Sequence, residues 1–448
     1  MKDVLHQLVA AVKTDSRNLA GRLGRKAGLH EALGWIGIEN GRSFNVEIEN
    51  VSIDATIVVY FGDEPDKMYQ LLQWLPILEQ LHESYRVVLL FRDVATFRQI
   101  RRHTELPRMF VRRFSSLMDL YEDNQFQLVL YVNNSRKNFQ SLEHPRLVHV
   151  HINHGESDKL SMVSNKAKAY DRVLVAGPAA IERYKARLID FDLDKLVISG
   201  RPQLDVRFEP TLAAHEKFTV MYAPTWEGEN EDNNYTSIDC YGVNIVRALL
   251  SCDDFRVIYK PHPRIIDSRT SSVRESHERI CALIDHSRRT GSNHEYHDSG
   301  NVLAMFDSID ALVADVSSVG LDFLYLCPNK PLVITDRRQN LPQLLLDTPV
   351  AGACNVISAR ELSSLNTLLP SWIKSDDFSE ERLDIRSYYF GDIRRGESTE
   401  RFFTHIADLL MDRRKKLPGY RAWHSAMGDE ANSFPPNRNH FQAQTETQ

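Results

Sequence analysis

The sequence contains few cysteines, and their arrangement argues against two kinds of site. Five cysteines occur among 448 residues, and no two of them form a Cys-x-x-Cys pair. An odd number at scattered positions predicts neither a disulfide framework nor a thiolate metal site, and it suits a reducing compartment. The five are Cys240, Cys252, Cys281, Cys327 and Cys354.

Long apolar runs are also missing. No segment approaches the roughly 20 apolar residues that a membrane-spanning helix needs. The apolar stretch from Val4 to Val12 is short and is interrupted by His6 and Gln7, so it does not resemble a signal peptide. These features predict a cytoplasmic protein.

Excess basic charge and several familiar motifs are absent as well. The net charge is −6, which argues against nucleic acid as a partner because nucleic-acid binders need a basic footprint. The sequence has no Walker A, GxSxG or clear GxGxxG motif. His149 and His151 share one face of an expected strand near His154, but no carboxylate or third-ligand pattern accompanies them, so we expect no metal site.

The length and the order of apolar segments predict two domains with terminal extensions. We expect an N-terminal extension at 1–50, a first domain at 51–208, a second domain with closing helices at 209–425, and a disordered tail at 426–448. Residues 1–33 hold six Lys/Arg against three Asp/Glu in an amphipathic pattern. Such a helix could rest on an anionic membrane surface or pack as a cap on the first domain.

Apolar runs that are continuous or nearly so alternate with helical segments in both domains. Strands of this kind are buried on both faces, which predicts parallel sheets covered by helices. The fold class is therefore α/β, with two Rossmann-like doubly wound domains. The expected strands are 55–61, 86–91, 127–131, 147–152, 172–175, 196–199, 218–222, 256–259, 311–314 and 332–334.

Polar motifs follow these strands at the edge where doubly wound sheets bind ligands. His154 and Gly155 come directly after the strand at 147–152. Glycine lets the backbone turn sharply, and histidine is well suited to accept a hydroxyl proton near neutral pH. Lys159 is placed to neutralise phosphate. The alternative is a loop histidine bonded to the backbone.

Two further loops bring candidate ligand groups to the same edge. Arg201 lies in a Gly/Pro-constrained loop, where its planar fork matches phosphate oxygens. The alternative is a hinge turn with an ion pair from Arg201 to Asp205, and the two roles are compatible. Thr225 follows Pro224 at a strand exit, so its hydroxyl can face a ligand, whereas Trp226 more often packs than stacks on a base.

The last two motifs indicate phosphate binding. Lys260, His262 and Arg264 are spaced by prolines in a stiff loop, and such a cluster is repulsive unless an anion is present. The alternative is an exposed basic turn. The segment Asp315–Ser318 joins the strand at 311–314 to a helix, so its serines can cap that helix while the amides face phosphate.

In this order the motifs resemble those of the CDP-glycerol:poly(glycerophosphate) glycerophosphotransferase family, which includes teichoic-acid primases and polymerases. The matching strings are HGESDK, GRPQLD, YAPTW, YKPHP and ADVSSVGLDFLYLCPNKPLVI. The similarity is clearest over 145–340 and looser over 54–410. Two positions depart from the family pattern: Glu227 stands where an arginine is common, and Val316 where an aromatic residue is common.

The resemblance implies a GT-B type fold, with an acceptor-side first domain and a donor-binding second domain. Members move glycerol phosphate or ribitol phosphate from a CDP-linked donor to a hydroxyl of a lipid-linked or capsular glycan, releasing CMP. The CDP-polyol is a substrate, and neither a cofactor nor a metal is implied. Peripheral contact with the inner face of an anionic membrane is also implied.

The family roles carry over to particular residues. His154 would be the general base or an acceptor-site group, with Gly155 and Lys159 beside it, and His262 would contact the donor pyrophosphate. The donor-binding residues implied are Arg201, Thr225, Lys260, His262, Asp315, Ser317 and Ser318.

Two other functions remain open from the sequence. The same scaffold supports sugar-nucleotide glycosyltransferases and nucleotide-sugar epimerases, because a fold does not fix a function. A non-catalytic membrane-associated scaffold that kept the fold is the third hypothesis.

Overall fold

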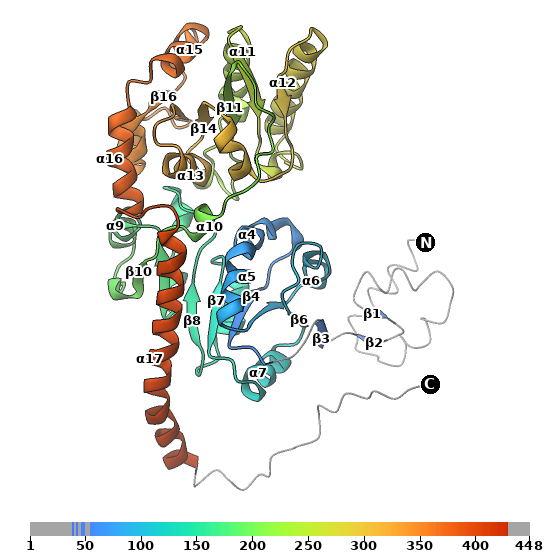
Figure 1. Ribbon diagram of the computed structural model, residues 1–448, viewed down its shortest axis with the longest axis vertical. Helices are drawn as coiled ribbons and strands as arrows, with labels where there is room; N and C mark the ends of the chain where they lie inside the picture. The colour runs from blue at the N-terminus through green and yellow to red at the C-terminus, as the bar shows by residue number, and fades with distance from the viewer. Residues whose placement is uncertain (1–37, 40–41, 44–45, 50–53, 429–448) are drawn as a thin grey trace.

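The computed structural model describes residues 38–39, 42–43, 46–49 and 54–428, with side chains from 54 to 417. The amphipathic stretch expected at 1–33 and residues 429–448 of the expected tail lie outside this range. Two α/β halves are stacked along the long axis of the molecule (Figure 1). We call residues 54–208 the first half and residues 209–390 the second half.

The first half contains most of an eight-stranded sheet, in the order β10-β9-β8-β7-β4-β5-β6-β3. Every neighbouring pair is parallel except β3 with β6. The central strands are apolar and fully buried, as a sheet covered by helices on both faces requires. The strands are β3 (Val46–Glu49), β4 (Ile57–Phe61), β5 (Val87–Phe91), β6 (Arg108–Val111), β7 (Leu128–Tyr131), β8 (Val148–His151), β9 (Arg172–Val175) and β10 (Leu196–Ile198).

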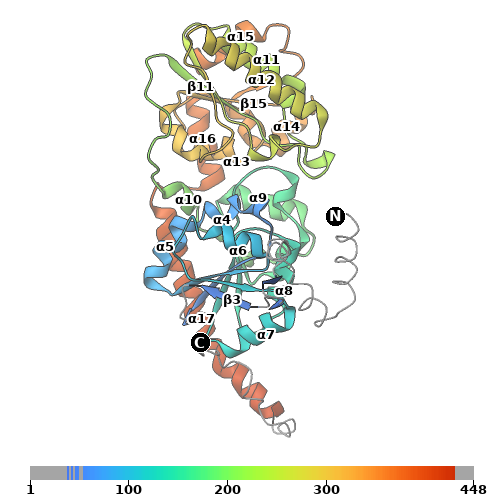
Figure 2. The ribbon, with the colours of Figure 1, turned by 90° about the vertical axis from the view of Figure 1, so that its right-hand side faces the viewer.

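Short helices connect these strands and cover the sheet (Figure 2). They are η1 (Pro65–Lys67), α4 (Tyr69–Leu72), α5 (Leu75–Ser84), α6 (Val94–Ile100), α7 (Phe114–Asp123), η2 (Arg136–Asn138), α8 (Phe139–Leu142), η3 (Leu160–Met162), η4 (Asn165–Ala169), α9 (Pro178–Arg187), η5 (Leu193–Lys195) and α10 (Pro202–Asp205). A small antiparallel pair, β1 (Ile38–Glu39) and β2 (Arg42–Ser43), precedes the sheet.

The second half is built on a six-stranded parallel sheet in the order β13-β12-β11-β14-β15-β16. Its strands are β11 (Phe218–Ala223), β12 (Phe255–Tyr259), β13 (Glu295–Tyr296), β14 (Ala311–Ala314), β15 (Leu332–Thr335) and β16 (Asn355–Ile357). Its helices are η6 (Glu231–Asn233), η7 (Ile238–Gly242), α11 (Val243–Leu250), η8 (Pro263–Ile265), α12 (Ser271–Arg289), η9 (Val302–Ser308), α13 (Ser318–Leu326), α14 (Leu341–Asp347), η10 (Pro349–Ala353), α15 (Leu365–Ser375) and α16 (Ser379–Phe390).

The α/β class with two parallel-strand sheets is confirmed, and the expected strands all occur within a few residues. The sequence did not predict β3, β6, β13 or β16, which are short or mixed in polarity. The helical path is interrupted between α4 and α5, because Pro76 lies in the first turn of α5 and cannot continue a preceding helix.

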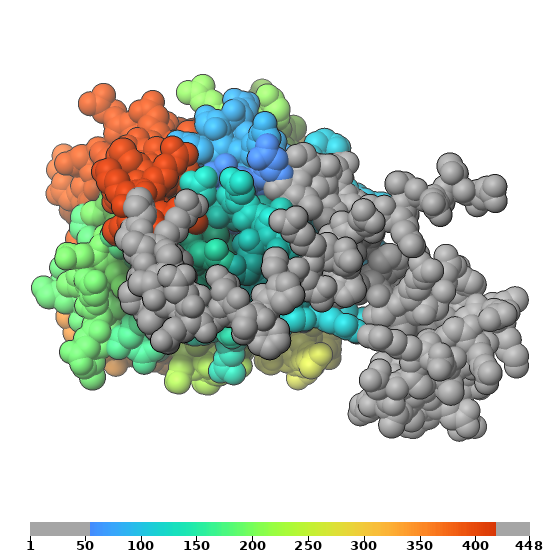
Figure 3. Space-filling model, turned by 90° about the horizontal axis from the view of Figure 1, so that it is seen from below, coloured from blue at the N-terminus to red at the C-terminus, as the bar shows by residue number. Residues whose placement is uncertain are grey.

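The long helix α17 (Glu397–Gly428) returns from the second half to the first. Its side chains Phe402, Ile406 and Leu410 are buried in the same apolar core as Trp74 and β8 residue Val150. Figure 3 shows the C-terminal segment lying directly against the first half. We expected the closing helices to belong with the second domain, but α17 packs on the first sheet because its apolar stripe completes that core.

Helix α17 also extends beyond the expected end, so residues 426–428 of the expected tail are helical. Across the part of the chain that the structure describes, none of the helices has both the length and the apolar composition needed to cross a membrane.

Candidate functional site

Loops at the carboxyl ends of both sheets meet between the two halves. The loop after β8 carries His154 to Lys159, and the loops after β11, β12 and β14 carry Thr225, His262 and Ser317. The Lys159 ammonium donates to the Thr225 hydroxyl oxygen across this junction at 2.8 Å. Tertiary packing therefore brings these four motifs to one junction, and Arg201 of the fifth motif reaches it through Asp322 of α13.

His154 projects from a turn that is fixed from several sides. Asn153 has φ +53°, a left-handed conformation that asparagine tolerates better than most residues. The Asn153 carbonyl accepts from the Trp74 indole at 2.5 Å, and the Asn153 side chain accepts from the His154 amide at 2.9 Å. Burial, and secondarily the Arg201 guanidinium, lowers the pKa of His154 to about 4, so its imidazole is neutral near pH 7.

Gly155 allows the two halves to approach each other closely. A Cβ at position 155 would lie 3.2 Å from the Ser318 Cβ, a contact tighter than ordinary packing. The strand-end turn of the first half therefore lies against the first residue of α13. This contact places His154 near the helix start that the sequence identified as a phosphate site.

The loops that follow β11, β12 and β14 form what we call the second-half wall, and Asp315 joins two of them from the protein interior. It is 1% exposed, and its carboxylate accepts from the Thr225 amide at 2.7 Å and from the Thr335 hydroxyl at 2.7 Å. Burial raises its pKa, opposed by these hydrogen bonds and by those from Ser237. Its two oxygens are thus used within the protein, and its contribution to a donor would act through the Thr225 loop.

His262 lies between aromatic rings from both halves. Its centroid is 6.2 Å from Trp226 and 5.7 Å from Tyr69 of α4. Its Nδ1 accepts from the Arg264 amide at 3.2 Å. Burial lowers the pKa of His262 to about 3, with further lowering from Lys159, Arg264, Lys260 and His154. Its imidazole is therefore neutral near pH 7 and surrounded by cations.

The Ser317 hydroxyl on the same wall is buried and has no hydrogen-bond partner within the described residues, and it makes no cap to its helix. Lys260 beside it is 5% exposed and forms no ion pair with a described residue, and burial lowers its pKa, opposed by Asp298. A buried hydroxyl in this state is costly unless a ligand satisfies it, and a nearby cation favours an anion as that ligand.

Arg201 forms an ion pair within the protein, whereas its loop suggested an anion-binding side chain. Its guanidinium pairs with Asp322 of α13 at 2.7 Å, and both side chains are buried. Asp205 accepts instead from the backbone of Gly396 and Thr399, so the alternative Arg201–Asp205 ion pair does not form. The sequence did not predict this pair, because Asp322 is distant in sequence and its own helix gave no sign of a partner; anion binding by Arg201 stays a prediction.

A buried network beside His154 had no recognised signal in the sequence. Arg183 of α9 pairs with Glu156 and Asp158 of the HGESDK loop, reaching Asp158 at 2.8 Å. The Tyr389 hydroxyl of α16 bonds the other Asp158 oxygen. Burial raises the pKa of Asp158 to about 7. Two acidic residues in a short loop are a weak signal, because exposed loops commonly carry them.

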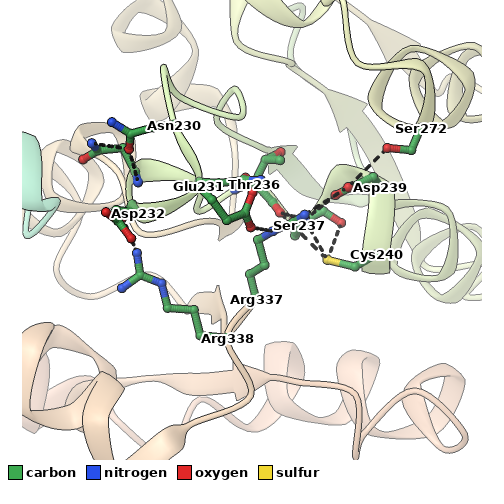
Figure 4. Close-up of polar contacts among 12 residues, drawn as sticks. Asn230, Glu231, Asp232, Thr236, Ser237, Asp239, Cys240, Ser272, Arg337 and Arg338 are labelled. Atoms are coloured by element: carbon green, nitrogen blue, oxygen red, sulfur yellow. Dashed lines mark hydrogen bonds and ion pairs between the residues drawn. The ribbon is translucent and has the colours of Figure 1, made fainter.

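The loop at 230–240 forms a second polar cluster at this edge (Figure 4). Arg337 donates to Asp239 at 3.1 Å and to the Thr236 carbonyl at 2.9 Å. Arg338 stacks on Tyr235, with its guanidinium carbon 4.4 Å from the ring centroid. These residues border a cavity of about 430 Å³, lined by Glu231, Asp232, Asn234, Cys240, Arg337 and Arg338.

The histidines considered as metal ligands have other surroundings. His149 is bonded to the Tyr131 hydroxyl and the His144 carbonyl, and His151 stacks on Tyr170 at 5.1 Å. Within the described residues, no group of three histidine, cysteine or acidic side chains is arranged to hold a metal.

Two facing α/β halves, each built on a mainly parallel sheet whose loops meet the other half, define a GT-B type protein, and the junction holds neutral histidines beside a buried, unpartnered Ser317 hydroxyl. A sequence profile of the family described as CDP-Glycerol:Poly(glycerophosphate) glycerophosphotransferase matches residues 63–407. The chain belongs to this family of glycerophosphotransferase enzymes. The comparison with curated proteins found no match.

Solved structures with the same fold support the architecture. A variant of the wall teichoic acid polymerase TagF with CDPG is 15% identical, with a TM-score of 0.52 over 92% of this chain and 97% of that chain. A UDP-N-acetylglucosamine 2-epimerase, described as putative, from Listeria monocytogenes is 12% identical, with a TM-score of 0.53 over 80% of this chain and 96% of that chain.

A glycosyltransferase from Rickettsia africae ESF-5 is 10% identical, with a TM-score of 0.51 over 80% of this chain and 99% of that chain. At such identities the likeness concerns the fold.

Proposed function

We propose that this protein transfers glycerol phosphate or ribitol phosphate from a CDP-linked donor to a hydroxyl of a lipid-linked or capsular glycan, in cell-envelope polymer synthesis. Family membership supports the reaction class. The observation that carries the proposal is the juxtaposition of neutral His154 with a wall containing His262, Lys260 and Ser317.

The donor diphosphate would bind against the second-half wall. Lys260 and the amides at the start of α13 supply positive charge, and Ser317 supplies a hydroxyl. Thr225, held through Asp315, completes the wall, and Lys159 reaches it from the first half. The 430 Å³ cavity beside Arg338 would receive the nucleoside.

The transfer would be an in-line displacement at the donor's β-phosphorus. The acceptor oxygen forms the new bond to this phosphorus while its bond to the bridging oxygen breaks, so that CMP leaves with the α-phosphate. His154 accepts the hydroxyl proton, and His262 with the nearby cations stabilises charge on the diphosphate. The reaction draws on positioning and electrostatics, with the CDP-polyol as substrate and no cofactor.

The acceptor glycan, the cytoplasmic location and a peripheral contact with anionic membrane are further parts of the proposal. They rest on the family resemblance. The division of the chain at residues 208 and 209 likewise remains a prediction.

Ligand-induced thermal shift tests the donor class directly, because a ligand that binds the folded state raises its apparent stability. CDP-glycerol, CDP-ribitol and CMP should stabilise the protein, and His262→Ala should abolish the shift. The exposed His286→Ala on α12 is the matched control and should respond like the unaltered protein. No response to any CDP-polyol would contradict the proposal.

The fold likeness to a UDP-N-acetylglucosamine 2-epimerase and a glycosyltransferase supports a second candidate, a sugar-nucleotide enzyme. Stabilisation by UDP-sugars alone would favour that candidate. Product analysis with the preferred donor, scoring CMP release against UDP release or epimer formation, separates these chemistries.

A further inference from the structure

The segment Pro65–Leu72 of the first half reaches the second-half wall, although no sequence motif marked it. Tyr69, the first residue of α4, is half-buried between the two histidines assigned to the reaction. Its ring centroid lies 6.1 Å from that of His154 and 5.7 Å from that of His262. It thus contacts one histidine from each half of the molecule.

The geometry of both contacts is specific. The Tyr69 ring is at 87° to the His154 imidazole and at 90° to the His262 imidazole, so both contacts are edge-to-face. Aromatic rings prefer this arrangement at centroid separations of about 4.5–7 Å. A single rigid ring therefore restricts the orientation of both imidazoles.

Two ion pairs hold the same segment against the second half. Asp66 lies 3.6 Å from Arg264, and Lys67 lies 3.9 Å from Glu229. Each pair alone contributes little at a surface. However, the first half supplies the acidic residue of one pair and the basic residue of the other. A shift of this segment by one residue would bring like charges together, and the two pairs therefore disfavour such a shift.

Arg264 connects this segment to the other face of His262. Its guanidinium carbon lies 3.9 Å from the centroid of the Trp226 ring, which packs on His262. His262 is thus enclosed by Tyr69 on one side and Trp226 on another. The Tyr69 hydroxyl is turned elsewhere and accepts from the Gln70 amide at 3.2 Å.

We propose that Tyr69 is a positioning residue of this site, whose ring sets the orientation of His154 and His262 and limits the access of water to both. The inference rests on the proposed function for the meaning of the two histidines. The ring performs this role, and the hydroxyl is dispensable. No proton passes through Tyr69.

Titration of the histidine C2 protons by NMR tests this without any substrate. In Tyr69→Ala, water would reach both imidazoles, and their pKa values should rise by about one unit or more toward the ordinary value. His294 is an internal control and should titrate unchanged, because burial and the nearby Lys217, Arg256 and His215 lower its pKa and neither His154 nor His262 contributes. Phe114→Ala, on the partly exposed start of α7, is the control for losing an aromatic ring elsewhere.

Steady-state kinetics with CDP-glycerol supplies the second readout. Tyr69→Ala should lower kcat about 10-fold or more while KM for the donor changes less, and Tyr69→Phe should stay within about 3-fold. If Tyr69→Ala does not fold, Tyr69→Leu keeps bulk without a ring and should show the same defects.

Unchanged titration of both histidines in the alanine or leucine variant would overturn the inference. A Tyr69→Phe variant as impaired as the alanine variant would overturn it as well, because the hydroxyl would then be required. An unaltered protein that fails to transfer polyol phosphate would refute the proposed function and still leave the NMR result to judge Tyr69.

Discussion

The two sides of the junction use their polar residues in opposite ways. On the first-half wall, which is the loop at 154–159 after β8, Glu156 and Asp158 are paired with Arg183, and Asp158 is also bonded by Tyr389. On the second-half wall, within the residues described, the buried Lys260 forms no ion pair and the Ser317 hydroxyl has no hydrogen-bond partner.

This difference distinguishes residues that hold the His154 loop in place from residues that are available to bind a ligand. Paired internal charges fix the loop that presents His154, and they leave little capacity for a ligand. Unpartnered groups raise the free energy of the empty site, and a ligand that satisfies them recovers it. A wall of the second kind is prepared for an anion, and a wall of the first kind orients a reactive side chain.

The largest effect should come from removing Arg183, the cation that pairs with the acidic residues of the first-half wall. Arg183→Met leaves two buried carboxylates without their cation and should lower the free energy of unfolding by about 3–5 kcal/mol. Chemical denaturation measures this, and CMP binding below the transition should be preserved. An Arg183→Met protein that is as stable as the unaltered protein but has lost CMP binding would contradict these assignments, because Arg183 would then serve binding and not stability.

The group that the first-half wall presents should control the rate. His154→Ala is expected to lower turnover by about 100-fold or more, the range for losing a general base. Thermal shift by CDP-glycerol should remain, because the donor binds to the other wall. Unchanged turnover would remove His154 from the mechanism, and the exposed His286→Ala serves as the histidine control.

A substitution on the second-half wall should lower donor affinity and leave stability unchanged or higher, the opposite of what we expect for Arg183→Met. Lys260→Met removes a buried cation that forms no ion pair with a described residue, so the protein without donor should be as stable or more stable. Donor affinity should fall about 10- to 100-fold, as expected for one charge-assisted hydrogen bond. Lys374→Met is the matched control, because Lys374 is exposed and its ion pair with Asp254 lies at the surface. Lower stability with normal affinity would show that Lys260 is structural.

The smallest effect is a pH dependence of donor binding. His262 has a pKa of about 3 because of burial and nearby cations, and a bound diphosphate would raise it. A ligand that raises a pKa binds more tightly as the pH falls through the interval between the free and bound values. We expect the Kd for CDP-glycerol to decrease from pH 7 to pH 5, by at most about 10-fold per pH unit.

The imidazole at position 262 should be the source of this effect. His262→Gln should therefore bind with an affinity nearly independent of pH over the same interval. An equal pH dependence in His262→Gln and the unaltered protein would assign it to another group, and no dependence in either would argue against a diphosphate beside His262.

The sequence was informative where structure depends on neighbouring residues. The apolar runs that became β4, β5 and β14 were recognisable because a strand buried on both faces must be continuously apolar. Short or mixed strands such as β6 and β16 carry no such signal. The motifs around His154 and His262 were located correctly at strand ends, since a parallel sheet gathers its loops at one edge.

The sequence was less informative about the partner of each side chain. Arg201 was expected to clamp an anion or pair with Asp205, and it pairs with Asp322 instead. Lys159 was expected to face phosphate, which stays a prediction, and the sequence did not show that it donates to Thr225. Tyr69 carried no motif and yet contacts both histidines.

By itself, then, the sequence determined the α/β class, the order of the strands along the chain and the loops that hold the polar motifs. These depend on the periodicity of apolar residues and on local turn chemistry, which neighbouring residues encode. Tertiary structure alone decided which charges are satisfied internally and which stay open, and it returned α17 to the first half. Those outcomes depend on side chains that are far apart in sequence and meet only when the two halves pack together, so no local pattern encodes them.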